Sequence, residues 1–426
     1  MVSSILFGVF IFLLLIGAPI TVALGMAAMA TFSFLGIDLT TLVQVAYNGV
    51  NSFPIMAVPS FILAGALMQY SGIARRLVSF AEELAGPMTG GMAASTVLAC
   101  MFFGAISGSG PATTAGVGML MIPAMIKRGY DKSYASAITA SSGGLGVVIP
   151  PSIPMVIFGV TASESITKLF IAGVIPGICL SAGIMLMNYF LCKKRGYKGD
   201  AHGWSILSIL KKMKEGFWAL MAPVVILGGI YSGLFTPTEA AVVSIFYTLF
   251  VGLFIYKELR LKYFLKSLDD TTWLSGRVLI IMFTAQAFGR LLVQYRIPYA
   301  IADALLSFTG NVVIIWLLVI VFLLILGMFM ETLATIMLVT PVLLPIMTHL
   351  GVDPIHFGIV LVCCCEVGFE TPPLGENLFI ASGIGGTTIE EISLLALPFT
   401  FVEVVTILLV AFVPFLSLWL PGIMGF

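Results

Sequence analysis

One segment constrains the fold of this chain more than any other. Residues 103–118 (FGAISGSGPATTAGVG) interrupt an apolar stretch with glycine, serine and proline. The interruption leaves backbone N–H and C=O groups that hydrocarbon cannot satisfy, so protein or a polar cavity must surround it. A second interruption, SSGGLGVVIPP at residues 141–151, follows one helical span later, and both kinds recur in the second half. We therefore predict a protein that moves a solute across a membrane and holds it at these breaks.

The composition excludes several other classes of protein. Hydrophobic residues make up 60% of the chain and charged residues only 9%. Soluble domains contain about 25% charged residues, so a soluble fold is excluded. Basic and acidic residues balance at 20 each, so no net charge attracts nucleic acid. The chain has no G-x-x-x-x-G-K-[ST] motif, so we do not expect it to hydrolyse ATP itself.

Cysteines and histidines indicate neither a disulfide framework nor a metal centre. The six cysteines lie in apolar segments or at the end of one, so we predict that they are packing residues. His202, His349 and His356 lack the spacing and carboxylate partners of metal ligands, and we interpret them as polar loop residues. Residues 1–24 have no basic start and remain apolar beyond any cleavage point, so we predict a first membrane span rather than a removable signal.

Apolar stretches of about 20 residues predict the membrane spans. Two stretches, about 91–127 and 311–348, are too long for one helix and carry central Gly/Ser/Thr-containing interruptions, so we interpret each as a re-entrant hairpin. An amphipathic segment precedes each hairpin, at 75–83 and at 295–307. The ten remaining candidate spans are about 3–17, 19–36, 53–70, 134–158, 167–192, 217–235, 238–256, 272–293, 355–381 and 393–420.

The distribution of basic residues orients these spans. If the base of the first hairpin, at 127–132, lies in the cytoplasm, 16 of the 20 Lys and Arg residues, including the three in this base, fall on the cytoplasmic side. The predicted outer loops 37–52 and 349–354 contain none. This asymmetry agrees with the positive-inside rule and places both termini outside.

The two halves of the chain match without a gap at a shift of 222 residues. The backbone-breaking residues coincide in register, and each half holds five full spans and one hairpin. An odd number of crossings inverts the second copy, which is typical of secondary transporters. The matched pairs include Pro123 with Pro345, Gly129 with Gly351, Asp131 with Asp353, Gly146 with Gly368, Pro150-Pro151 with Pro372-Pro373, and Pro176 with Pro398.

The tip of the first hairpin has the features of an anion site. Proline in the first helical turn needs no N–H partner, so we expect Pro111 to start the returning half-helix. The N–H groups of the next residues, Ala112, Thr113 and Thr114, would then point into the tip and favour an anion. Ser107 and Ser109 add hydroxyl oxygens. A tight helix–helix contact made from small residues is the alternative.

The partner break, Gly143 to Pro151, is expected to unwind a spanning helix. Pro150 and Pro151 remove two donors, which leaves carbonyls near Gly146 and Ile149 available to a hard monovalent cation such as sodium. The repeat predicts a matching site from Gly327, Gly368, Thr371 and Pro373. A simple proline kink in each helix is the alternative.

The second half differs from the first in charge. Glu331 lies at the second hairpin tip, and Glu366, Glu370 and Glu376 flank the second break. Intramembrane carboxylates are costly and usually functional. They could bind protons, hold a cation, accept substrate hydroxyls or face a water-filled vestibule. Arg290, near the outer end of a span, could snorkel or pair with one of these acids.

Five motifs resemble the large membrane subunit of tripartite ATP-independent periplasmic (TRAP) transporters. The resemblance covers essentially the whole chain. The motifs are GAISGSGPAT at 104–113, KRGYD at 127–131, IPPSIPM at 149–155, GLFTPTEA at 233–240 and TPPLGENL at 371–378.

The resemblance implies an elevator-type transporter, an all-α polytopic membrane protein with inverted repeats, two re-entrant hairpins and two broken helices. It implies sodium ions as coupling ions and import of organic acids such as C4-dicarboxylates, sialic acid or other sugar acids. One implied sodium site consists of Ser107, Ser109, Gly146, Ile149 and Pro151. The other implied sodium site consists of Gly327, Gly368 and Thr371. The predicted substrate contacts are Thr113, Glu331 and Asn377.

The implied partners are a small four-helix membrane subunit and a periplasmic substrate-binding protein, in a bacterial inner membrane. Because the chain begins directly with the large subunit, we expect the small one to be a separate polypeptide. The chain is predicted to divide into scaffold and transport-domain segments. The scaffold segments are 1–90, with an arm helix, and 167–310, with a second arm helix. The transport-domain segments, each a hairpin and a broken helix, are 91–166 and 311–392, and 393–426 is a final span.

Three other functions remain open. A stand-alone proton- or sodium-coupled carboxylate carrier would use Glu331 and Glu370. An intramembrane enzyme would need a nucleophile–base pair or metal cluster at membrane depth, and the spans contain no Ser/His/Asp or His/Glu set. A channel would not require two symmetric hairpins. We therefore expect a transporter and not an enzyme.

Overall fold

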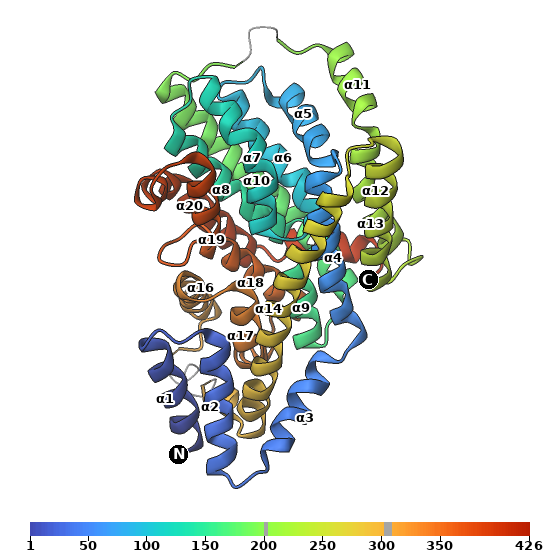
Figure 1. Cartoon of the computed structure of the whole chain (residues 1–426). Coiled ribbons are helices and arrows are strands. Elements are labelled where there is room, and N and C mark those ends of the chain that lie inside the picture. Colours follow the sequence, from blue (N-terminus) through green and yellow to red (C-terminus); the bar gives the residue numbers. More distant parts are fainter. Residues whose placement is uncertain (200–202, 302–308) are drawn as a thin grey trace.

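The computed structural model describes residues 1–199, 203–301 and 309–426, and every regular element in these ranges is a helix (Figure 1). Within this part of the chain, seven helices are long and apolar enough to cross a membrane, or up to nine if each bent pair is one span. The predicted all-α polytopic fold is confirmed. The first half contains α1 (Val2–Leu15), α2 (Ile20–Phe34), α3 (Leu39–Val50), η1 (Phe53–Met56), α4 (Ala57–Tyr70), α5 (Ile73–Ala85), α6 (Gly91–Ser107), α7 (Gly110–Lys127), α8 (Lys132–Val148), α9 (Ile153–Ala162) and α10 (Ile166–Arg195).

The second half repeats much of this order and adds a long central helix, α14. It contains α11 (Ile206–Glu215), α12 (Phe217–Tyr231), α13 (Pro237–Phe250), η2 (Val251–Ile255), α14 (Leu261–Gln294), α16 (Val312–Phe329), α17 (Thr332–His349), α18 (Pro354–Gly368), α19 (Glu376–Gly385), α20 (Ile389–Phe412) and α21 (Phe415–Ile423).

Each predicted hairpin is a pair of helices joined by a tight turn. α6 ends at Ser107, and its C-cap Gly108 has a φ of +63°, a left-handed conformation that glycine adopts without a Cβ clash. α7 begins at Gly110 with Ser109 as its N-cap and Pro111 in its first turn, as predicted. In the second pair, two residues separate α16 from α17, and Glu331 is the N-cap of α17.

Both predicted breaks are present, but the first begins later than expected. α8 and α9 meet at an angle of 40° across four residues, 149–152. Gly143 and Gly146 remain helical, so the predicted unwinding from Gly143 is wrong. Glycine weakens a helix by only about 1 kcal/mol, whereas two consecutive prolines stop it. The second break, 369–375, separates α18 from α19, and the two prolines in each break are joined by a cis peptide bond.

Three other elements differ from the prediction. The predicted outer loop 37–52 contains the amphipathic helix α3, which starts at the N-cap Asp38 and packs on α14. α14 begins at Leu261, well before the predicted span at 272–293. α20 ends at Phe412, and Pro414 separates it from α21, so 393–420 is not one span. The predicted amphipathic segment 295–307 lies partly outside the described residues.

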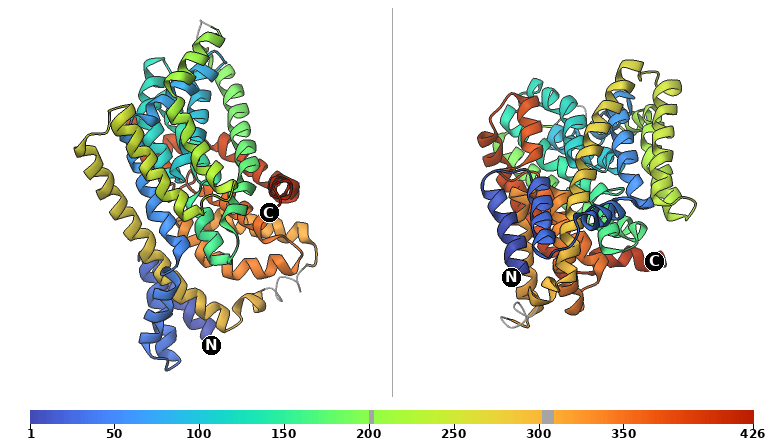
Figure 2. Two further views of the ribbon diagram at one scale, coloured as in Figure 1. Left: turned by 90° about the vertical axis from the view of Figure 1, so that its right-hand side faces the viewer. Right: turned by 60° about the horizontal axis from the view of Figure 1, so that its bottom comes forward.

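The helices pack as two groups that meet along α14 and where α4 and α5 pack on α6. Figure 2 shows α14 as a long diagonal helix, and it contacts α2, α3 and α4 on one side and α17 on the other. The second group contains the hairpins and broken helices, with α10 and α20 packed against each other and against α8 and α18. Which group moves stays a prediction, as do the predicted domain boundaries.

Candidate functional site

A cavity of about 560 Å³ lies where the two hairpin tips meet α14, and we call it the central cavity. Its walls come from the four segments that interrupt the helices and from one face of α14. The wall includes Ser109, Pro111 and Ala112 of the first tip, Ile153 and Pro154 after the first break, Glu331, Thr332 and Leu333 of the second tip, Phe369, Leu374 and Glu376 of the second break, and Trp273 and Arg277 of α14.

Four helices begin at this cavity. α7, α9, α17 and α19 all start with residues that line it. The first N–H groups of a helix lack intrahelical partners and carry partial positive charge, so four such ends favour an anion. Part of this demand is met within the protein: Ser109 accepts the Ala112 N–H at 3.4 Å, the Gly108 carbonyl accepts the Ile153 N–H at 3.1 Å, and the Phe369 carbonyl accepts the Asn377 N–H at 3.0 Å. α17 has no side-chain cap, so its first N–H groups lie open at the cavity wall.

Arg277 is the cation of the central cavity. Its Nη2 lies 3.2 Å from a carboxylate oxygen of Glu331 and 3.2 Å from one of Glu376. Its guanidinium lies 5.8 Å from the ring centre of Trp273, one turn earlier on α14. Arg277 is 39% exposed and Glu331 only 11%, so the arginine remains open to the cavity while the acid is covered. Both ion pairs join α14 to the hairpin group.

The remaining wall is apolar and aromatic. Phe369, Leu374 and Trp273 surround the charged groups, with Ile153 and Leu333 beside them. A concave, mostly apolar site with a few convergent polar groups is the usual form of a small-molecule site. The cavity can therefore bind a small organic molecule with an acidic group directed to Arg277 or to the helix ends.

The structure brings together most of the first predicted sodium site. Thr113 Oγ1 lies 2.8 Å from both Ser107 Oγ and the Ser109 carbonyl. A Cβ on Gly146 would stand 2.4 Å from Thr113 Oγ1, so only glycine allows this approach of α8 to the tip. The Gly146 carbonyl cannot receive a helical bond from residue 150, because that residue is proline.

The second predicted sodium site has the same construction. Gly327 of α16 and Gly368 of α18 meet backbone to backbone, since a Cβ on Gly368 would stand 2.7 Å from the Gly327 carbonyl oxygen. Thr371 Oγ1 donates to the Val367 carbonyl at 2.7 Å, which leaves its lone pairs available. Leu374 donates its N–H to the Met328 carbonyl at 3.0 Å and ties the second break to the hairpin.

A cluster of buried acids lies behind this break. Glu366 and Glu370 are buried, and Glu403 of α20 interacts with both of them. None of their carboxyl oxygens has a hydrogen-bond partner of good geometry in the described part of the chain. Glu370 also lines a cavity of about 180 Å³.

Not all of the predicted substrate contacts reach the central cavity. Glu331 lines it, whereas Thr113 is buried in the first predicted sodium site. Asn377 is buried and donates to the Ala140 carbonyl at 3.0 Å. Arg290 lines a different cavity. The ion pair with an intramembrane acid that was considered for Arg290 is made by Arg277 instead. The signal for Arg277 was present in the sequence, since it is a charged residue inside a predicted span.

His356 corrects the histidine prediction. It is a buried residue of α18, not a loop residue. Its Nδ1 lies 2.7 Å from Ser417 Oγ and its Nε2 lies 3.1 Å from the Ala411 carbonyl, so it fastens α21 to the core. His349 ends α17, and His202 lies outside the described residues.

The fold and the central cavity define a class of protein, the polytopic membrane transporters. Sequence comparison specifies the class further: the family described as "Tripartite ATP-independent periplasmic transporter, DctM component" matches residues 7–416. The chain belongs to this family, so the predicted resemblance is confirmed. It is a multi-pass membrane protein of a family of transporter permeases.

Two relatives illustrate the similarity. The isethionate TRAP transporter permease protein DctMQ of Oleidesulfovibrio alaskensis is 44% identical over 98% of this chain, which spans 66% of that relative's length. The C4-dicarboxylate large permease protein DctM of Rhodobacter capsulatus is 35% identical over the full length of both chains.

Solved structures share the fold at low identity. The YdaH transporter of Alcanivorax borkumensis has a TM-score of 0.63 at 16% identity and covers 98% of each chain. MtrF of Neisseria gonorrhoeae has a TM-score of 0.61 at 16% identity, over 88% of this chain and 84% of that one. At this identity, the likeness concerns the fold alone.

Proposed function

We propose that this chain imports an organic acid by sodium-coupled symport through the central cavity. The observation that carries the proposal is the meeting of Arg277, its two carboxylate partners Glu331 and Glu376, and four helix starts at one mostly apolar cavity. The relatives' names refer to isethionate, C4-dicarboxylate, sialic acid and 2,3-diketo-L-gulonate. These are acids of different size, so the acidic group is the shared feature that such a site would bind.

Sodium coupling is supported by the two glycine-mediated contacts at the breaks. Each combines hydroxyl groups with backbone carbonyls beside a break, and in the first the Gly146 carbonyl has no helical donor because residue 150 is proline. Such neutral oxygens suit a hard monovalent cation, which needs no carboxylate. We assign the first ion to Ser107, Ser109, Gly146, Ile149 and Pro151 and the second to Gly327, Gly368 and Thr371.

The proposed movement is an elevator motion of the hairpin group against the scaffold. Both ion pairs of Arg277 cross the boundary between the groups, so movement would break them and substrate would compete for the same arginine. We further propose a small membrane subunit and a periplasmic substrate-binding protein as partners, and the bacterial inner membrane as the location. Family membership supports these proposals.

A second candidate is a stand-alone carrier coupled to protons or sodium through acidic residues. Glu331 in the central cavity and the buried Glu370 favour it. It predicts uptake without a binding protein and a pH optimum that shifts in Glu370→Gln.

The sodium assignment is tested by Thr371→Val in proteoliposomes. We expect a weaker sodium activation of uptake, because valine removes the hydroxyl ligand without changing the shape of the side chain. Thr406→Val is the matched control, since Thr406 also donates its hydroxyl to the carbonyl four residues earlier but lies in α20. Unchanged sodium activation in Thr371→Val would refute the site.

A further inference from the structure

A second large cavity lies away from the central cavity, between α5, α11 and the start of α12. Its volume is about 510 Å³, and we call it the basic cavity. Arg75 and Arg76 of α5 line one side, and Lys212 and Lys214 of α11 line the other. Trp218 and Tyr256 complete the wall. These residues belong to the basic segments that the charge distribution places on the cytoplasmic side of the membrane.

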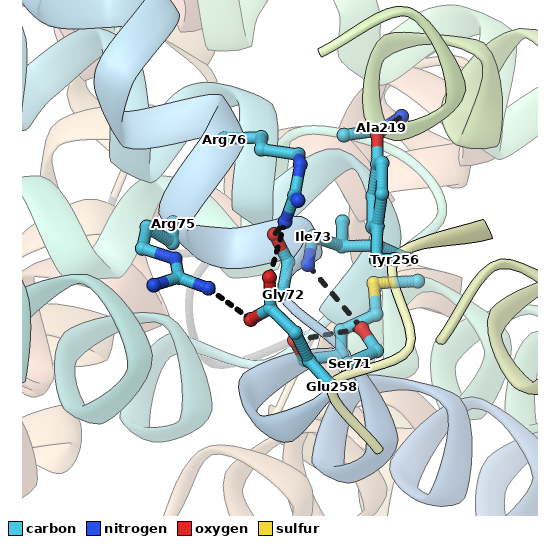
Figure 3. Close-up of polar contacts among 9 residues, drawn as sticks. Ser71, Gly72, Ile73, Arg75, Arg76, Ala219, Tyr256 and Glu258 are labelled. Carbon is cyan, nitrogen blue, oxygen red and sulfur yellow. Dashed lines mark hydrogen bonds and ion pairs between the residues drawn. The ribbon is translucent and has the colours of Figure 1, made fainter. Parts of the chain in front are cut away.

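The charges around the basic cavity do not balance. Arg75 and Arg76 share a single carboxylate, that of Glu258, and Arg76 Nη1 lies 2.8 Å from it. Figure 3 shows both guanidinium groups directed to Glu258. Lys212 pairs with Glu215 at 3.1 Å. Lys214 makes no ion pair with any described residue. Four cations therefore face two carboxylates, and the cavity has an excess of positive charge.

The wall of the cavity also holds one arginine in a fixed position. The Arg76 guanidinium lies 3.5 Å from the ring centre of Tyr256, and Nη1 donates to the Gly72 carbonyl at 3.0 Å (Figure 3). The Tyr256 hydroxyl accepts the Ala219 N–H at 3.1 Å, which fixes the ring against α12. Because this guanidinium is already held in place, less conformational entropy is lost when it contacts a phosphate.

α11 carries an apolar face beside this cavity. Ile206, Leu207, Leu210 and Met213 are all exposed, and no residue of α11 is buried. Its lysines lie on the same short helix, in its last turn and just before it. A basic amphipathic helix of this kind lies in the membrane interface, with its apolar face among acyl chains and its lysines at the headgroups. Lipid is thus adjacent to the mouth of the basic cavity.

We propose that the basic cavity binds the headgroup of an anionic phospholipid. The phosphate would lie between Arg76 and Lys214, and the acyl chains would run along the apolar face of α11. Basic pockets between helices on the cytoplasmic side are suited to such headgroups. A soluble phosphate compound would use the same cations but would gain nothing from the exposed apolar residues, so the structure favours the lipid.

Lipid binding to the purified full chain, alone and with its small membrane subunit, tests the proposal. Native mass spectrometry would compare retention of phosphatidylglycerol with that of phosphatidylcholine. We expect phosphatidylglycerol to bind more tightly and Lys212→Gln/Lys214→Gln to weaken it about tenfold or more, given the contribution of each lysine near an anionic surface. The matched control is Lys211→Gln, on the same helix but not in the cavity wall, which should bind within about twofold of the unsubstituted chain.

Four results would overturn the proposal. Equal binding of the two lipids would exclude an anionic headgroup site. An equal loss in Lys211→Gln would mean diffuse attraction to the whole helix. Full displacement of phosphatidylglycerol by millimolar inorganic phosphate would assign the cavity to a soluble anion. Loss of the lipid when the small subunit is added would make this surface a protein-docking site instead.

Discussion

At the scale of single residues, the arginine on α14 sets the chemistry of the central cavity. Arg277→Gln should raise the KM for the acid and lower uptake at limiting substrate about 10- to 100-fold, since a charged hydrogen bond contributes about 1.5–3 kcal/mol. Initial uptake rates over a range of substrate concentrations measure this. Arg290→Gln is the matched control, because Arg290 lies on the same helix but lines another cavity. A wild-type KM in Arg277→Gln would contradict the assignment.

The first hairpin tip allows a second residue-scale prediction. Gly108→Ala should destabilise the protein, because the left-handed conformation costs a non-glycine residue about 1–2 kcal/mol. In addition, the new Cβ would stand 2.8 Å from the Pro151 carbonyl oxygen. Gly129→Ala separates the two effects, since Gly129 has a φ of +85° but nothing within 4 Å. Thermal unfolding in detergent should rank Gly108→Ala below Gly129→Ala, and equal losses would disprove the close contact.

Residues that break the backbone were predictable, and residues that act through distant contacts were not. Ser109, Pro111 and Gly146 follow from local rules, because proline and glycine restrict the chain wherever they occur. Arg277 could have been singled out as a charged residue inside a predicted span, but its ion pairs could not be predicted, because Glu331 and Glu376 lie 54 and 99 positions away along the chain. Only the crossing of α14 over the second tip brings them together.

At the scale of elements, one acidic side chain fastens α5 to the linker after η2. Burial opposes ionisation of Glu258, but hydrogen bonds from Arg76 and Arg75 outweigh it and lower the pKa of Glu258 below 4.5. The resulting stabilisation is present above pH 4.5 and is lost as the pH falls through the lower folded-state pKa. Because the groups are partly exposed, it amounts to about 1 kcal/mol or less.

Hydrogen exchange in α5 measures this contribution. At pH 7, Glu258→Gln should exchange faster than the unsubstituted chain, and the difference should shrink as the pH falls below 4.5. Glu164→Gln, in the loop after α9, is the control and should leave α5 unchanged. A difference that does not depend on pH would mean that Glu258 acts through packing and not through its charge.

Among the elements, the amphipathic helix α5 was predicted closely, since the expected segment 75–83 lies within Ile73–Ala85, whereas α3 and α11 were not predicted. α10 begins and ends within a few residues of the predicted span 167–192, and α16 and α17 together match the predicted hairpin at 311–348. α3 was missed because it is short, and polar residues such as Thr40, Thr41 and Gln44 alternate with its apolar ones, so the segment resembles a loop between two spans. α11 lies in a basic region in which charge obscured the helical period.

At the scale of the whole molecule, the proposed motion requires α14 and α17 to slide past each other. In a cysteine-free background, a short crosslink between Gly289→Cys and Pro341→Cys should arrest uptake. These positions face each other across the boundary, since a Cβ on Gly289 would lie 3.9 Å from Pro341 Cγ. A crosslink between Gly183→Cys and Val402→Cys joins α10 to α20 within one group and should leave uptake intact. Full activity with α14 tied to α17 would exclude an elevator.

The most direct test of the account is uptake of a labelled organic acid into proteoliposomes. The proteoliposomes would contain this chain and its small membrane subunit. Uptake would be measured with and without an inward sodium gradient, and with and without a substrate-binding protein. We predict uptake only when both are present. Uptake that persists without the binding protein, or without sodium, would contradict the account and make the acidic residues Glu331 and Glu370 the leading candidates for coupling.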